Sequence, residues 1–255
     1  MKVATWNVNS LRARLEHVTS WLQRRQPDVL CMQETKVEDE HFPHEELARL
    51  GYSVIKAGQK SYNGVAIASR SPLSDVRIGL LGASPTDDKR VISAVVEDMR
   101  VICIYAPNGK AVDSEAFAHK LSWYRQLRML LDDLPPPKNG TLLCGDFNIA
   151  PEERDVYDPD LFRGQLHFHP DEHAALKHVL AHGLTDLFRL HNVAGKQYSW
   201  WDYRAGSFRR NLGLRIDYIL GSPAVASRCT EVLIDKEERA QPKPSDHCPV
   251  MANLS

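Results

Sequence analysis

Acidic and amide residues stand at the ends of short apolar runs along almost the whole length of this chain. The runs cover about residues 3–6, 29–33, 142–145, 214–216 and 248–251. Apolar runs of this length, bounded by turn residues, are typical of buried strands. The polar residues at their ends are Asn7, Asn9, Glu34, Asp146, Asn148, Asp217, Asp246 and His247. Oxygen-rich side chains at the ends of several core strands predict one site at the edge of a sheet, and such a site suits a hard divalent cation such as magnesium.

The length and composition are those of a globular protein. We expect the 255 residues to form one domain, residues 1–255, which is long enough to bury most of its unfolded surface. Hydrophobic residues make up 43% of the chain and charged residues 25%, and both values are ordinary for a soluble protein. Because the net charge is −1, any binding of nucleic acid has to come from a local basic face rather than from a global positive field.

The cysteines and the first residues favour a cytosolic protein. Cys31, Cys103 and Cys144 lie inside apolar runs, whereas Cys229 and Cys248 are isolated. With an odd number of cysteines and no CxxC pair, we expect neither a disulfide framework nor a cysteine-rich zinc site, which favours a reducing compartment. The chain enters a strand directly, without the apolar region of a signal peptide, and no apolar stretch is long enough to cross a bilayer.

The hydrophobic pattern predicts a mixture of strands and helices. Helices are expected near residues 11–25, 44–50, 113–134 and 170–182, with Asp113 or Ser114 as the cap of the long third one. Strands are expected at residues 2–7, 28–33, 52–56, 64–69, 74–79, 91–97, 100–105, 141–145, 197–201, 214–220, 231–235 and 249–254. Mixed runs of strands with a few long helices fit two packed sheets with helices outside.

The set of acids is more informative than any one of them. A single acid at a strand end is usually a turn residue or a helix cap. Glu34 and Asp146, however, each follow a core-like strand, where a carboxylate costs free energy unless it is paired or bound to a metal. Asp146 and Asn148 lie two residues apart, so in an extended segment they face the same side. His247, beside Asp246, can transfer a proton or offset charge near neutral pH, although a lone histidine is more often structural.

Six motifs of this chain together resemble the exonuclease III family of apurinic/apyrimidinic endonucleases, and they occur in the order found in that family. They are Trp6–Ser10, Gln33–Glu34, Tyr105–Gly109, Gly145–Pro151, Leu214–Tyr218 and Ser245–Pro249. Each motif is a modest signal by itself, but six in order are strongly specific, and they span about residues 3 to 250. The wider superfamily also includes deoxyribonuclease I, inositol polyphosphate phosphatases, sphingomyelinases and deadenylases.

The resemblance implies an α/β fold, a four-layer α/β sandwich with two packed mixed β-sheets flanked by helices. It implies hydrolysis of the phosphodiester 5′ to an abasic site, which leaves a 3′-hydroxyl, together with 3′→5′ exonuclease and 3′-end phosphodiesterase or phosphatase activity. The expected cofactor is Mg²⁺ or Mn²⁺, because an oxygen-rich site accepts both. The expected partner is double-stranded DNA with abasic sites or 3′ ends, bound by a monomer.

The resemblance also implies which residues surround the metal. Glu34 is the principal ligand, and the others are Asn7, Asn9, Asp146, Asn148, Asp246 and His247.

The same resemblance implies the catalytic roles. Asp146 orients and deprotonates the attacking water, and Asn148 steadies the pentacovalent phosphate. Tyr105 donates a hydrogen bond to the phosphate or the leaving group. His247, oriented by Asp217, binds the scissile phosphate. These roles suit phosphodiester cleavage, which needs a positioned water and stabilised oxyanions.

Residues 196–215 combine basic and aromatic side chains, as expected of a loop that follows a phosphate backbone and stacks on or wedges between bases. The resemblance implies that this loop, with Arg204, Arg209 and Arg210, enters a DNA groove. It also implies that a pocket of Trp200, Leu214 and Ile216 receives the flipped abasic sugar, which is cheap to unstack. Trp201 fits a strand core equally well.

Further contacts to DNA phosphates are expected from polar residues spread along the chain, although a solvated surface role is an equal alternative for any single lysine. They are Arg12, Lys36, Lys60, Tyr62, Asn63, Arg90, Asn108, Lys110 and Lys120. His167, His169 and His173 could suggest zinc, but a proline interrupts their spacing and no cysteine is nearby. A surface loop that enters a helix is therefore favoured for this segment.

Two other functions are alternatives to this nuclease activity. A non-enzymatic relative that regulates or binds RNA should have lost catalytic acids, and all of them are present here. A phosphoesterase for inositol phosphates or lipids is disfavoured by the basic aromatic loop at 200–215 and by the lack of a membrane-insertion hairpin.

Overall fold

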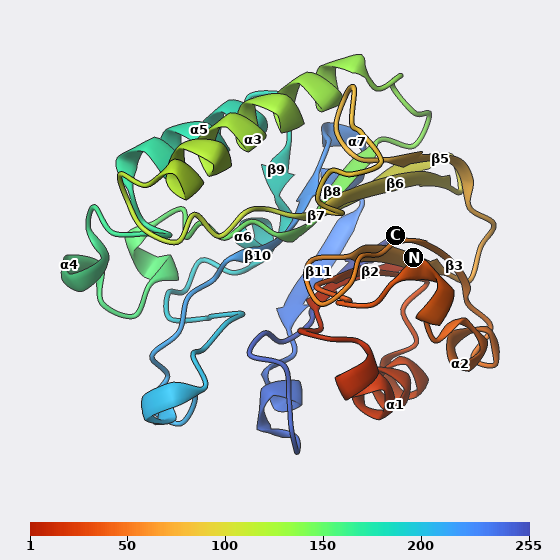
Figure 1. Cartoon of the computed structure of the whole chain (residues 1–255), viewed down its shortest axis with the longest axis horizontal. Coiled ribbons are helices and arrows are strands. Elements are labelled where there is room, and N and C mark those ends of the chain that lie inside the picture. Colours follow the sequence, from red (N-terminus) through yellow and green to blue (C-terminus); the bar gives the residue numbers. More distant parts are fainter.

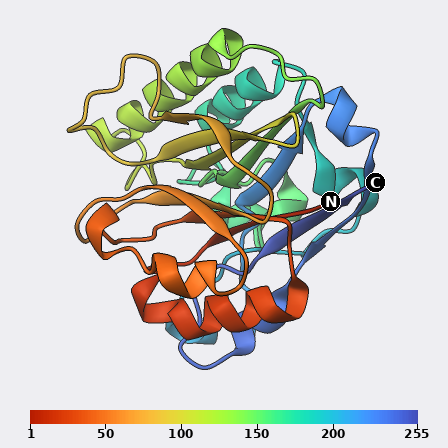
Figure 2. The same ribbon diagram turned by 90° about the vertical axis from the view of Figure 1, so that its right-hand side faces the viewer.

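The computed structural model describes residues 1–255 and contains two six-stranded sheets packed face to face. Helices cover the outer face of each sheet, which makes four layers (Figure 1 and Figure 2). The predicted four-layer α/β sandwich is therefore confirmed.

The first sheet has the strand order β11-β12-β1-β2-β4-β3. In that order its strands are Cys229–Ile234, Val250–Leu254, Lys2–Asn7, Val29–Gln33, Val65–Ser69 and Ser53–Ala57. The second sheet has the order β5-β6-β7-β8-β10-β9. Its strands are Ser74–Ile78, Val91–Val96, Met99–Tyr105, Thr141–Asp146, Asp217–Gly221 and Thr185–Asp186. Each sheet contains one parallel pair, β1 with β2 and β7 with β8, and its other pairs are antiparallel.

The outer layers are built from helices of very different length. The α-helices are α1 Leu15–Arg25, α2 His44–Ala48, α3 Glu115–Asp133, α4 Pro159–Phe162, α5 Pro170–Leu180, α6 Leu187–His191 and α7 Pro223–Ala226. Short 3-10 turns are η1 Arg12–Arg14, η2 Asp39–His41, η3 Glu153–Asp155, η4 Arg204–Gly206 and η5 Lys236–Ala240. Helices α1 and α2 cover the first sheet, while α3 and α5 lie side by side over the second (Figure 2). No helix is long and apolar enough to span a membrane.

Alternation along the strands decides which side chains face the space between the sheets. In β1, Val3 belongs to the core between the sheets, whereas Ala4 and Trp6 pack toward α1. In β8, Cys144 faces the other sheet and Leu143 faces α3. Because side chains two apart share a face of a strand, the last residue of each such strand also points between the sheets. This alternation directs Asn7, Tyr105 and Asp146, the last residues of β1, β7 and β8, into the space between the sheets at one end of the sandwich.

Most predicted elements are present, with boundaries that differ by a few residues. The helix predicted at 11–25 begins with a 3-10 turn at Arg12–Arg14 and ends at Arg25, where Gln26 caps it in a left-handed conformation with a φ of 48°. Ser114, rather than Asp113, caps α3 by accepting a hydrogen bond from the Phe117 backbone N–H.

The strand predicted at 197–201 is wrong, and the one predicted at 214–220 begins only at Asp217. Trp200 instead forms isolated bridges with Leu214 and with His247. The Ser199 hydroxyl accepts hydrogen bonds from the backbone N–H groups of Ile216 and Asp217, both at 3.1 Å. The Ser199 hydroxyl therefore takes the place of the backbone carbonyls that would accept from these two N–H groups in a regular β-ladder.

Candidate active site

Three titratable side chains converge where the two sheets meet. Ligand atoms of Glu34, Asp146 and His247 all lie within 4.8 Å of one another. Glu34 follows β2 of the first sheet, Asp146 ends β8 of the second, and His247 precedes β12. Residues separated by more than 200 positions thus form one cluster at the mouth between the sheets.

The Asn7 side chain joins the two carboxylates across the interface between the sheets. Its Nδ2 donates to Glu34 Oε1 at 2.7 Å and to Asp146 Oδ2 at 3.0 Å. Its Oδ1 accepts from the Asn9 backbone N–H at 3.0 Å. Asn7 itself is fully buried, so a single ordered amide sets the separation of the two acids.

His247 lies between two carboxylates. Its Nδ1 is 2.9 Å from Asp217 Oδ2, and its Nε2 is 3.7 Å from Asp146 Oδ2. Ser199 Oγ donates to Asp217 Oδ2 at 2.6 Å, which fixes that carboxylate. Burial by itself lowers the pKa of His247, but the attraction of Asp217 and Asp146 outweighs it and raises that pKa to about 10. The ring is therefore an imidazolium at neutral pH, with its Nε2–H directed toward Asp146.

We expect the His247 ring to titrate well above the ordinary histidine value of 6.5, and to titrate lower in an Asp217→Asn variant. Because the folded pKa of His247 is raised, its pairing with Asp217 stabilises the fold fully below about pH 6.5, and this contribution is lost as the pH rises through about 10. Ring-proton NMR measures the midpoint, with the His247→Asn spectrum as the assignment control. A wild-type midpoint near 6.5 contradicts this charge arrangement.

The pKa of Asp146 is also raised, and for a carboxyl group this favours the uncharged form. Burial raises the pKa of Asp146 to about 7, while the His247 cation acts against this rise. The carboxylate accepts hydrogen bonds from Asn7 Nδ2 and, through Oδ1, from the Asn148 backbone N–H at 2.9 Å. A carboxylate whose pKa lies near neutrality is suited to accept a proton and release it again.

Tyr105 completes the wall of the site at the end of β7. Burial and the carboxylates of Glu34 and Asp146 raise the pKa of this phenol far above its ordinary value, so it stays a neutral hydrogen-bond donor. Arg90 lies over the Tyr105 ring at 4.8 Å and donates to its backbone carbonyl at 3.3 Å. Arg90, one of the predicted DNA contacts, thus lies directly behind the candidate site.

Asn148 follows Asp146 in a left-handed backbone conformation, with a φ of 53°. Its Nδ2 donates to Ala106 O at 3.0 Å, and its Oδ1 accepts from Asn108 Nδ2 at 3.3 Å. The side chain is thereby held in the loop that follows Tyr105. The structure thus places Asn108, one of the predicted DNA contacts, beside Asn148.

The donor set fits a hard cation. Lys36 Nζ lies 2.8 Å from Glu34 Oε2 and 2.6 Å from Asn9 Oδ1, so these oxygens already converge on one positive charge. Asn9 Nδ2 in turn donates to Asp246 Oδ1 at 2.9 Å, and Trp200 Nε1 donates to Asp246 Oδ2 at 3.0 Å. Carboxylate and amide oxygens of this kind are the ligands that magnesium and manganese prefer. Lys36 therefore contacts the acidic cluster instead of standing free on the surface.

The three residues of the implied sugar pocket lie together. Leu214 and Ile216 are buried in a cluster with Ala150 and Phe168, and the half-buried Trp200 packs against it. Trp201, in contrast, is fully buried beside Tyr198 and Cys248 and belongs to the core. Of the two alternatives for Trp201, a strand core or a DNA contact, the structure supports a place in the core.

The predicted DNA contacts divide into three groups. Exposed side chains are those of Arg12, Lys60, Tyr62, Asn108, Lys110, Arg204, Arg209 and Arg210. Lys36, Asn63 and Arg90 are partly or mostly covered. Lys120 is wrong as a surface contact, because it is completely buried and forms an ion pair with the equally buried Glu172. The sequence did contain a sign of this burial, because Lys120 lies beside the apolar stripe of α3.

The supporting contacts of Ser199 and Tyr203 at the site were not predicted from the sequence. Ser199 supports Asp217, and Tyr203 Oη accepts from Asn9 Nδ2 at 3.3 Å and from Arg14 Nη2 at 3.2 Å. The histidine segment does not form a common site. His167 Nδ1 lies 2.7 Å from Asn148 O, and His169 caps α5. No spacing in the sequence pointed to these contacts.

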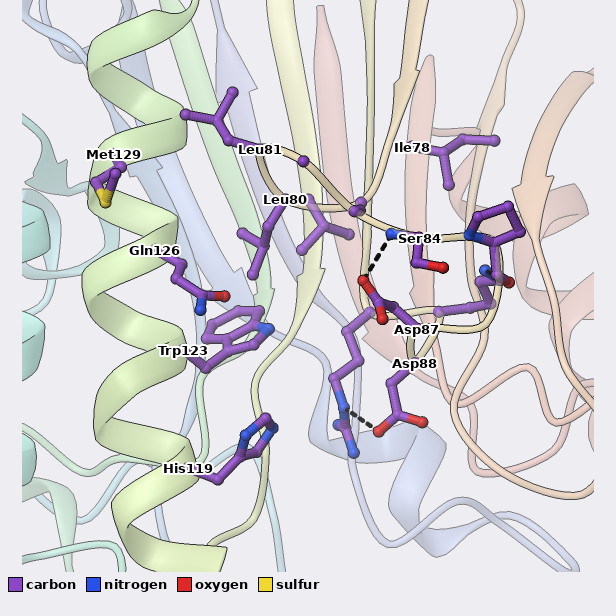
Figure 3. A pocket seen from close by; sticks show the side chains of 17 residues that line it. Ile78, Leu80, Leu81, Ser84, Asp87, Asp88, His119, Trp123, Gln126 and Met129 are labelled. Atoms are coloured by element: carbon purple, nitrogen blue, oxygen red, sulfur yellow. Dashed lines mark hydrogen bonds and ion pairs between the residues drawn. The ribbon is translucent and has the colours of Figure 1, made fainter.

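A pocket between α3 and the loop after β5 lies away from the acidic cluster. It has a volume of about 790 Å³ and is lined by residues 78–85 and 87–91 and by His119, Trp123, Gln126 and Met129 of α3. Figure 3 shows Trp123, Gln126 and Met129 on the helix facing Leu80 and Leu81 of the opposite loop. Since none of Glu34, Asp146 and His247 lines it, the candidate site is identified by its chemistry and not by the size of a hollow.

Comparisons with known proteins agree with this geometry. The Endonuclease/Exonuclease/phosphatase family model matches residues 4–247. Exodeoxyribonuclease III of Haemophilus influenzae is 38% identical over 266 residues, which cover 100% of both proteins.

Two solved structures are similar over the whole chain. One is the 3′-phosphatase NExo of Neisseria with an Asp-to-Asn substitution, bound to a product DNA hairpin. It is 44% identical, has a TM-score of 0.96, and covers 100% of this chain and 99% of that one. The other is an AP endonuclease of Archaeoglobus fulgidus, at 41% identity and a TM-score of 0.95, with coverage of 100% and 99%.

Proposed function

This chain belongs to the Endonuclease/Exonuclease/phosphatase family, and on that basis we propose that it is a divalent-metal-dependent DNA repair nuclease. The observation that carries the proposal is the cluster of Glu34, Asp146 and His247, which Asn7 ties together across the two sheets. A base for the attacking water and a charged donor to the phosphate, beside a cation site, are suited to the hydrolysis of a phosphodiester.

Asp146 is the general base of the proposed reaction. Its carboxylate is held by Asn7 and by the Asn148 backbone, so its free electron pairs have a defined direction. With a pKa raised to about 7, it takes a proton from the attacking water more readily than an ordinary aspartate does.

His247 donates from Nε2 to the scissile phosphate. Asp217 holds the other ring nitrogen and keeps the ring charged, so the donor is positive before the reaction begins. A protonated ring has no lone pair for a metal, and this favours the phosphate-binding role of His247 over the role of ligand. Tyr105 and Asn148 add neutral donors on the side of β7.

Glu34 is the principal residue of the proposed metal site, with Asn7, Asn9 and Asp246 around it and Asp146 and Asn148 close by. Bound there, Mg²⁺ or Mn²⁺ supplies positive charge to the phosphate oxygens. The residues themselves orient the phosphate relative to Asp146. A metal bound by Glu34 would compete with the Lys36 ammonium, which lies 2.8 Å from Glu34 Oε2, and a displaced Lys36 would be available to a DNA phosphate.

We propose double-stranded DNA with 3′ ends or abasic sites as the substrate of a cytosolic monomer. The relatives support three related reactions, since their names include exodeoxyribonuclease III, a 3′-phosphatase and an AP endonuclease. The apolar cluster of Trp200, Leu214 and Ile216 supports incision at abasic sites, since apolar side chains favour a sugar without its base.

A single set of substrates tests these activities. Labelled duplexes carry a tetrahydrofuran abasic analogue, a recessed 3′-hydroxyl end or a 3′-phosphate, and an intact duplex is the control. We expect cleavage with Mg²⁺ and none with EDTA, and the rates on the three substrates rank the activities. Absence of cleavage on all three with Mg²⁺ or Mn²⁺, from folded protein, would contradict the proposed function. Turnover of an inositol phosphate by the same protein would then establish a different phosphoesterase.

Replacement of Glu34 by glutamine should weaken the response to metal. We expect the Mg²⁺ concentration for half-maximal activity to rise by at least about 10-fold, a loss seen even when an outer partner of a metal ligand is removed. Glu38→Gln is the matched control, because Glu38 is an exposed acid four residues away. An unchanged Mg²⁺ response in Glu34→Gln contradicts the role of Glu34.

A further inference from the structure

Four consecutive backbone carbonyls after Asp146 each accept a hydrogen bond from a side chain. They belong to Phe147, Asn148, Ile149 and Ala150, the segment that carries the proposed phosphate-binding amide. Their partners, in the same order, are Tyr124, Lys120 together with His167, Tyr218, and His173. These partners come from α3, α5, β10 and the loop before α5, so the segment is held from several directions.

Lys120 makes the widest set of these contacts. Its ammonium donates to Asn148 O at 2.6 Å, to Asn108 O at 3.1 Å and to Glu172 Oε1. It therefore ties the loop after β7 to the loop after β8, and both loops carry residues of the proposed site. Lys120 and Glu172 have no exposed surface at all.

The pair comes from the two helices that cover the second sheet. Lys120 lies on α3 and Glu172 in the first turn of α5, where its second oxygen accepts from the His169 backbone N–H at 3.1 Å. The packing of α3 on α5 thus places one charge on each side of their contact. Glu172 directs the ammonium, and the ammonium directs the two carbonyls.

Stability is a poor reason for such a pair. Removing two charges from water is costly, and replacing a buried ion pair by uncharged groups of similar volume is often neutral or stabilising. The ion pair of Lys120 and Glu172 therefore adds little stability. Its position is better explained by its contacts with the two loops of the proposed active site. A displacement of about 1 Å in a catalytic group can reduce turnover 100-fold.

We propose that Lys120, held by Glu172, is a positioning residue that fixes the backbone of Asn108 and Asn148 and so sets the orientation of the Asn148 amide toward the phosphate. The proposal rests on the proposed nuclease function. It assigns Lys120 no contact with DNA.

The test is the double variant Lys120→Met with Glu172→Gln. Methionine matches the length of lysine without its donors, and glutamine keeps the oxygen that caps α5. We expect the double variant to stay folded, because no unpaired charge is left buried. We expect kcat to fall about 10- to 100-fold while KM changes less than about threefold, because the loop is misplaced but the DNA-binding surface is intact. The single variant Lys120→Met should be less stable than the double variant, since it leaves Glu172 alone.

A matched control and a readout independent of activity separate the outcomes. Arg100→Met removes another buried cation, at the opposite end of β7 from Tyr105, and should change unfolding but not kcat. Amide hydrogen exchange should be faster over residues 147–150 in the double variant and unchanged in Arg100→Met. A double variant with wild-type kcat and wild-type exchange overturns the proposal. If the wild type itself has no nuclease activity, the proposed function fails, and the exchange experiment still decides whether Lys120 holds the loop.

Discussion

Replacement of Asp146 by asparagine is expected to lower kcat by at least about 100-fold while the protein stays folded. The carboxylate is 1% exposed and faces His247 Nε2 across 3.7 Å, so no other base can take its place from bulk solvent. An amide keeps the size of the side chain and can still accept from the Asn148 backbone N–H. It cannot take a proton from water, and this is the function that the variant removes.

The measurement is single-turnover cleavage of the 3′-end and abasic substrates, with circular dichroism to follow folding. Asp158→Asn is the control, because Asp158 is an exposed aspartate that caps α4 and an asparagine can cap equally well. In the wild type the rate should rise with pH until Asp146 is deprotonated, and a bound cation would lower the midpoint of that rise below about 7. This rise should be absent in Asp146→Asn. Wild-type turnover by the variant would remove Asp146 from the mechanism.

The second large effect is expected from His247→Asn. Loss of one donor to a developing negative charge typically costs 10²- to 10³-fold in kcat, and we expect a decrease of about that size. The effect should fall on kcat more than on KM, because the phosphate is bound by many other contacts and the charge on its oxygens grows in the transition state.

His247 also separates two buried carboxylates, so its removal changes the electrostatics of the fold. Asp217 and Asp146 then lose the cation between them, and unfolding of the variant has to be measured beside its activity. His182→Asn is the control, since His182 forms an exposed pair with Asp132 at 3.0 Å. A His247→Asn protein that is folded and fully active is incompatible with the proposed role.

The positions of the site residues along the chain were largely predictable. Asn7, Glu34 and Asp146 stand at the ends of short apolar runs. Strands that are buried on both faces consist of such runs, so the sequence predicts these strands. The alternation of side chains then explains why Asn7, Tyr105 and Asp146 point between the sheets. Asp217 and His247 were paired on the strength of the family resemblance, and the structure places them 2.9 Å apart.

The wrong or missing predictions concern side chains whose contact partners are not determined by the sequence pattern around them. Because a lysine in a helix is usually exposed, Lys120 was predicted to contact DNA. It is instead buried on the apolar side of α3. Residues 197–201 have the composition of a strand, but they close on Leu214 and His247 through single bridges. His167 and His173 belong to a polar segment whose two rings reach the carbonyls of Asn148 and Ala150.

The sequence by itself determined which runs are strands, where they end and which residue types stand at those ends, because periodicity and burial are local properties of the chain. Only the tertiary structure decided which of those residues meet. Glu172 lies 52 residues beyond Lys120, and Asp146 lies 139 residues beyond Asn7. Contacts over such separations depend on how α3 packs on α5 and on how the two sheets are stacked, and these arrangements are set by the whole core rather than by any segment of the chain.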